Sequence, residues 1–94
     1  MWNIFLDKHR TGLYLVGMHP VRKALNAWKA ANPGKTDADF AAHVGYANPD
    51  AVYKQIRGEY IAPPSKLRVM AEVLGWSAGR FLNECEKHQA RRVA

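Results

Sequence analysis

From residue 20 onward, apolar residues recur at the three- and four-residue spacing that is typical of amphipathic α-helices. The first apolar stripe consists of Val21, Ala24, Leu25 and Trp28. Pro20 marks the start of this helix, because a first-turn residue has no helical use for the N–H group that proline lacks. The segment Asn32-Pro33-Gly34 then ends the first predicted helix.

The second predicted helix begins after Thr36, which is expected to cap it. Asp39 lies three residues further on, in a weaker relative of the capping box, where an acidic side chain reaches back to the cap. The inward-facing residues of this helix are Phe40, Ala41 and Val44. Gly45 is expected to close it in a left-handed turn.

The third predicted helix starts near Pro49. Asn48 supplies a cap, Pro49 a fixed φ angle and Asp50 an acid near the positive end of the helix dipole. Val52 and Ile56, four residues apart, are expected to face the core. Gly58 stops the helix. The residues on its polar side are Asp50, Tyr53, Lys54 and Arg57.

Two more helices complete the pattern. After the rigid connector Ala62-Pro63-Pro64, Ser65 is expected to cap a fourth helix that ends at Gly75. The apolar stripe of this helix consists of Leu67, Met70, Ala71 and Leu74. Ser77 starts a fifth helix, which carries Phe81, Leu82 and Cys85 and is expected to fray in the basic tail HQARRVA. Five short helices joined by brief loops predict a compact all-α domain over residues 18–94.

Residues 1–17 differ from this helical pattern. Two apolar runs, MWNIFL and LYLV, flank the polar segment DKHRTG, which indicates an extended arm or a short β-hairpin. A short helix is the alternative, because Trp2, Phe5 and Leu6 lie at helical spacing. A lone hairpin needs a surface to pack on, and a second copy of the chain is one such surface.

Composition and charge indicate which class of binding partner suits the domain. At 94 residues, with 48% hydrophobic and 23% charged residues, the chain is expected to form one packed domain. The formal net charge of +6 favours a polyanionic partner, of which nucleic acid is the commonest. Residues 19 to 35 hold four basic residues and no acid, whereas residues 36 to 58 hold three acids and two basic residues. The positive charge therefore borders the third predicted helix more than it lies on it.

Several classes of protein are disfavoured. The single cysteine, Cys85, excludes an internal disulfide and indicates a reducing, cytoplasmic location. No apolar run approaches the roughly 18 residues of a membrane span. The four histidines, His9, His19, His43 and His88, lack the paired spacing of zinc ligands, and no phosphate-binding loop or nucleophile motif is present. We expect no metal, no cofactor and no enzymatic activity.

The central segment resembles a known family. TDADFAAHVG, AVYKQIRGE and PPSKLRVMAEVLGWSAGRFL are similar to the second, third and last two helices of XRE-type helix-turn-helix domains, which occur in phage Cro proteins, phage repressors and many bacterial regulators. The resemblance runs from Val21 to Leu82, about two thirds of the chain. The spacing between Gly45 and Gly58 departs from the commonest family pattern by about one extra residue, in YANPD.

The resemblance implies that the third helix enters the major groove of DNA. The residues it would present to base edges are Asn48, Asp50, Tyr53, Lys54 and Gln55. Structural roles compete with three of these assignments. Asp50 also suits the helix dipole, Tyr53 also suits the edge of the core, and Gln55 also suits a half-buried position against the fourth helix.

The predicted phosphate contacts surround the third helix. Lys35 and Thr36 are expected to present free N–H groups at the positive end of the second helix. The complete predicted set is Lys35, Thr36, Arg57, Tyr60, Arg22 and Lys23.

The sequence thus predicts a sequence-specific regulator of the Cro type, which binds a double-stranded DNA operator as a homodimer. The dimer is expected to form through the N-terminal arm, the fifth helix or both. The alternative is an antitoxin whose first 17 residues clasp a toxin and whose helix-turn-helix serves autoregulation. Base stacking on single strands by the three tryptophans is a more remote reading, because Trp28 completes a core stripe and Trp76 lies between two helices.

Overall fold

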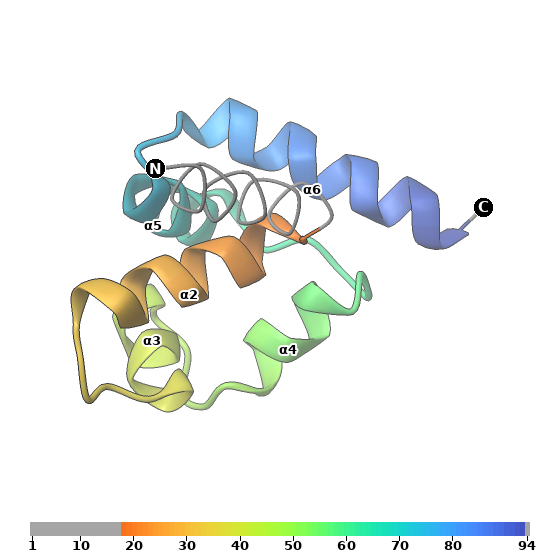
Figure 1. The fold of residues 1–94 in the computed structure, drawn as a ribbon. Helices are drawn as coiled ribbons and strands as arrows, with labels where there is room; N and C mark the ends of the chain where they lie inside the picture. Colours follow the sequence, from red (N-terminus) through yellow and green to blue (C-terminus); the bar gives the residue numbers. More distant parts are fainter. Residues whose placement is uncertain (1–17, 94) are drawn as a thin grey trace, which may run out of the picture.

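The computed structural model describes residues 18–93, which contain five α-helices and no strand (Figure 1). The helices are α2 (Pro20–Ala31), α3 (Asp37–Val44), α4 (Asp50–Ile56), α5 (Pro64–Leu74) and α6 (Ala78–Val93). The prediction of an all-α fold is confirmed for this part of the chain. The predicted arm or hairpin over residues 1–17 lies outside the described residues.

Helix α2 is the centre of the fold and packs against each of the other four helices. In Figure 1, α5 and α6 lie on one side of α2, and α3 and α4 lie on the other. The largest fully buried side chains come from every helix and include Leu25, Phe40, Val52, Met70 and Phe81. These side chains form a single apolar core, in which α4 packs against α2. Their burial is the main contribution to the stability of the fold.

The predicted cap at the start of α3 and the predicted left-handed turn at its end are both confirmed. The Thr36 hydroxyl accepts a 3.2 Å hydrogen bond from the Asp39 N–H group, and the Asp39 carboxylate accepts one of 2.9 Å from the Thr36 N–H group. This is a reciprocal capping box. At the other end, Gly45 adopts a left-handed conformation with φ of +115° and donates its N–H group to Ala41 and Ala42.

Two predictions about helix ends are corrected, and one helix cap that was not predicted is present. Helix α5 begins at Pro64 with Pro63 as its N-cap, and no side chain caps it, so Ser65 is not a cap. Helix α2 is capped by His19, whose Nδ1 atom accepts a 3.1 Å hydrogen bond from the Val21 N–H group. Helix α6 continues to Val93 through the tail that was expected to fray.

The start of α4 agrees with the prediction to within one residue. Pro49 is its N-cap, and the Asn48 side chain accepts a 3.0 Å hydrogen bond from the Asp50 N–H group. Among residues 18–93, no helix combines the length and the apolar character that a bilayer crossing demands.

Candidate nucleic-acid interface

Helix α4 has one buried side and one exposed side. Val52 and Gln55 are buried, and Ile56 packs partly buried against the core. The side chains on the outer side belong to Asp50 and Lys54, which are exposed, as is Asn48 just before the helix. Three of the five predicted base contacts thus lie together on an accessible polar surface.

The prediction that Gln55 contacts a base is corrected by its position in the structure. Its side chain is only 1% exposed, and its amide nitrogen donates hydrogen bonds to the Tyr46 hydroxyl at 2.9 Å and the Ala51 carbonyl at 3.1 Å. Gln55 therefore stabilises α4 instead of presenting its amide to a base.

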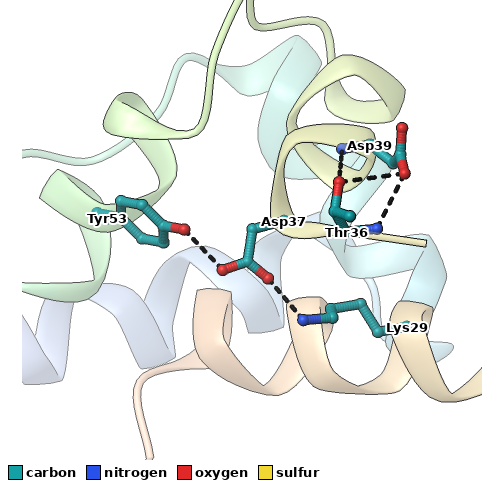
Figure 2. A network of polar contacts seen from close by, with 5 residues as sticks. All are labelled: Lys29, Thr36, Asp37, Asp39 and Tyr53. Carbon is teal, nitrogen blue, oxygen red and sulfur yellow. Dashed lines mark hydrogen bonds and ion pairs between the residues drawn. The ribbon is translucent and has the colours of Figure 1, made fainter. Parts of the chain in front are cut away.

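Tyr53 belongs to a polar network that joins three helices (Figure 2). The Tyr53 hydroxyl in α4 donates a 2.6 Å hydrogen bond to Asp37 Oδ2 at the start of α3. The other oxygen of Asp37 accepts a 2.8 Å charged hydrogen bond from Lys29 Nζ in α2. Hydrogen bonds to an ionised partner are stronger than neutral ones, so Asp37 holds α4 against both α2 and α3.

The network fixes the protonation of its members. Hydrogen bonds from Lys29 and then from Tyr53 lower the pKa of Asp37 below its ordinary 3.8. The bond to Asp37 in turn raises the pKa of Tyr53 above 10.0. At neutral pH, Asp37 is ionised and Tyr53 is neutral, with its hydroxyl proton in the hydrogen bond to Asp37. Arg22 lies seven residues, about two helical turns, before Lys29 and therefore on the same side of α2, and its charge acts on both groups.

Lys35 and Thr36 are exposed, but their backbone N–H groups are not free as predicted. The Lys35 N–H group donates to the Asn32 carbonyl at 3.1 Å, and that of Thr36 donates to Asp39. The capping box and the preceding turn therefore use the donors that were assigned to phosphate. The Lys35 ammonium group can still pair with an anion, and it borders a concavity of about 470 Å³. The concavity is lined by Lys29, Lys35, Thr36, Asp37, Ala38, Pro49 and Tyr53.

The remaining predicted phosphate contacts differ in their surroundings. Arg57 is exposed and forms a 2.6 Å ion pair with Glu59. The Tyr60 hydroxyl lies 3.4 Å from the Ala51 carbonyl, at the far end of hydrogen-bonding range. Lys23 lies apart from the other predicted phosphate contacts. Its ammonium group is 5.4 Å from the centre of the Trp76 ring, next to α6.

The roles of Asp37 and Lys29 in this network were not predicted from the sequence. One signal was present: the capping box needs a single acid, and Asp39 fills that role, which leaves Asp37 without a local partner.

No known protein family, curated protein or solved structure matches the chain. The resemblance to XRE-type domains therefore stays a prediction, and so does the antitoxin alternative, which depends on residues 1–17. Within the described part of the chain, no group of three or more His, Cys, Asp and Glu side chains forms a candidate metal site.

Proposed function

We propose that the chain is a sequence-specific double-stranded DNA-binding regulator of the helix-turn-helix, phage-repressor type. In this proposal α3 and α4 form the helix-turn-helix, α4 enters the major groove, and the protein occupies an operator as a phage or prophage repressor of the Cro type does. The main observation that supports this proposal is that α4 has one buried side and one exposed polar side. Its buried side is fastened by Val52 and Gln55, and its outer side leaves polar groups exposed.

The exposed groups have the chemistry of base recognition. Lysine donates to the acceptors of guanine, aspartate accepts from cytosine, and asparagine forms two hydrogen bonds with adenine. Lys54, Asp50 and Asn48 supply these three functions within seven consecutive residues. Tyr53 contributes differently, since its hydroxyl is bonded to Asp37. In the proposed complex its ring borders the bases while the hydroxyl holds α4 in place.

Attraction to the DNA backbone comes from residues around α4. Lys35, on the loop before α3, lines the same concavity as Asp37, and the charge of Arg22 on α2 acts on Asp37. Lys29 neutralises Asp37, which would otherwise repel phosphate groups. The net charge of +6 adds a general attraction that depends on salt.

Two copies on two half-sites are part of the proposal. A single domain of this size covers too little DNA for tight binding, and half-sites one helical turn apart, about 34 Å, suit a homodimer. Residues 1–17, α6 or both would form the dimer contact.

Selection of bound sequences from random duplexes tests the proposal. We expect enrichment of a palindromic motif whose half-sites lie about 10 base pairs apart. Affinity for the selected duplex should fall steeply with added salt. Absence of enrichment, or sedimentation as a monomer both free and with the selected duplex, would contradict the proposal.

A further inference from the structure

Trp76 presents an aromatic ring at the junction of α5 and α6. Gly75 ends α5 in a left-handed conformation with φ of +71°, and the Trp76 N–H group then donates to the Ala71 carbonyl at 2.9 Å. The indole packs against the buried Phe81, with 6.1 Å between ring centres. Trp76 is only partly buried, so part of its ring remains accessible.

Two cations from different helices lie over this ring. The guanidinium carbon of Arg80 in α6 is 3.9 Å from the ring centre, and Nζ of Lys23 in α2 is 5.4 Å from it. Both distances are within the range of a cation–π interaction. Two positively charged groups therefore lie next to the apolar ring of Trp76.

A concavity of about 420 Å³ adjoins the ring. It is lined by Lys23, Asn26, Ala27, Leu74 and Trp76. Ala27, Leu74 and Trp76 give it a largely apolar lining, to which Lys23 and Asn26 add polar groups. Protein interfaces have this arrangement, with an apolar centre that includes a large aromatic residue and a polar rim.

Glu84 offsets part of the positive charge of Lys23 and Arg80 but forms no ion pair with either of them. Glu84 forms a 3.1 Å ion pair with Lys87, and Glu86 is exposed on the same helix. Lys23 and Arg80 act on Glu84 through charge alone, as no hydrogen bond joins either cation to it in the structure. Both cations thus remain available to an anionic partner.

This surface is separate from the candidate DNA interface. The charge of Arg22 acts on Asp37 and Tyr53, whereas Lys23, the next residue, lies over Trp76. Consecutive residues project about 100° apart around a helix, so the two surfaces use different sides of α2. A partner on Trp76 leaves the outer side of α4 open, and the inference does not depend on DNA binding.

We propose that the Trp76 surface, formed by Lys23, Asn26, Ala27, Leu74, Trp76 and Arg80, binds an acidic segment of a partner protein. One large apolar side chain of the segment packs into the concavity against Trp76 and Leu74. Flanking carboxylates pair with Lys23 and Arg80. Charge complementarity selects acidic segments over basic ones, and the aromatic centre supplies most of the affinity.

Display of random short peptides against the full chain tests this proposal. We expect selected peptides to share one large apolar residue flanked by Asp or Glu. The best peptide is then synthesised, together with a version in which each acid is replaced by its amide. Calorimetric titration should show about tenfold weaker binding of the amide version. Backbone amide shifts in NMR spectra should cluster at the residues of the Trp76 surface.

A matched pair of double variants separates local from general charge effects. Lys23→Gln with Arg80→Gln should weaken the acidic peptide about tenfold or more. Lys66→Gln with Arg68→Gln removes the same charge from α5, at positions outside both the Trp76 surface and the candidate DNA interface, and should change affinity less than about twofold. Circular dichroism checks that both variants are folded.

Four results would overturn the proposal: no enriched peptide, enriched peptides without acids, equal weakening by the two double variants, or shifts away from Trp76. A fifth concerns the class of ligand. If indole-3-acetate displaces the peptide at concentrations similar to the peptide's own dissociation constant, the surface binds small carboxylates and not a protein segment.

Discussion

The Tyr53 hydroxyl donates a 2.6 Å hydrogen bond to the Asp37 carboxylate, which joins the middle of α4 to the first residue of α3 (Figure 2). The two helices carry the proposed helix-turn-helix, and Lys29 ties the same carboxylate to α2. One acidic side chain thus helps to set the position of the helix proposed to read DNA. Helix α4 has only seven residues, so contacts of this kind matter for its orientation.

The first prediction concerns the pKa of Asp37. Lys29 is the largest cause of its lowered pKa and Tyr53 the second. We therefore expect Lys29→Met to raise the pKa of Asp37 more than Tyr53→Phe does, with both values moving towards the ordinary 3.8. NMR titration of the Asp37 carboxyl group measures this, and Tyr60→Phe is the control. The reverse order would show that the network is arranged differently.

The same network shows what the sequence predicts and what it does not. The capping box of Thr36 and Asp39 joins residues three apart, so local pattern was sufficient to find it. The bond between Asp37 and Tyr53 spans 16 residues and depends on how two helices cross. Gln55 was misassigned for a related reason, because its amide is satisfied by Tyr46, nine residues away. Long-range polar pairing has no periodic signal in a single sequence.

The failure at Ser65 has a local cause. Serine is a common N-cap, but Pro63 and Pro64 fix their own φ angles and start α5 at Pro64, which leaves Ser65 inside the first turn. His19 was missed because imidazole is an uncommon cap. Its Nδ1 atom accepts the Val21 N–H group only while the ring is neutral there.

The second prediction follows from His19. Burial, and then the nearby His88, lower the pKa of His19 from 6.5 to about 4. The unfolded chain therefore binds this proton more readily than the folded one between these two pH values. The contribution of His19 to the free energy of unfolding is fully present above pH 6.5, and on the order of 3 kcal/mol should be lost as the pH falls to about 4. Urea unfolding across this range measures the loss.

His19→Asn is the matched control for this pH dependence. Asparagine keeps a side-chain acceptor at the N-cap but has no proton to gain. The variant should show a flatter dependence of the unfolding free energy on pH over the same range. Equal slopes in the two proteins would mean that another group, not His19, is responsible.

The third prediction concerns the turn after α3. Gly45 has φ of +115°, a conformation that side chains with a Cβ atom rarely adopt. In Gly45→Ala the added Cβ would lie 3.1 Å from Nζ of Lys66, the movable end of a flexible side chain, so backbone strain is the main effect. We expect a loss of about 1–2 kcal/mol in the free energy of unfolding.

Gly79→Ala is the control for this substitution. A Cβ atom at Gly79 meets nothing within 4 Å, and the residue lies in α6, where alanine is the better helix former. This variant should be neutral or slightly more stable in the same thermal or urea unfolding measurement. A neutral Gly45→Ala would show that the turn tolerates another backbone conformation.

The last prediction separates residues that read bases from those that bind the backbone. Lys54 is exposed on the outer side of α4, whereas Lys35 lies at the loop before α3. Lys54→Ala should therefore relax sequence preference, by about 1–3 kcal/mol of discrimination at the affected base pair. Lys35→Ala should weaken binding to all duplexes alike and lower the salt dependence by about one charge. Titration of the selected duplex and its single-base variants, at several salt concentrations, measures both quantities. If the two variants lose specific and non-specific binding in the same proportion, the outer side of α4 does not read bases, because a reading side chain must discriminate between sequences.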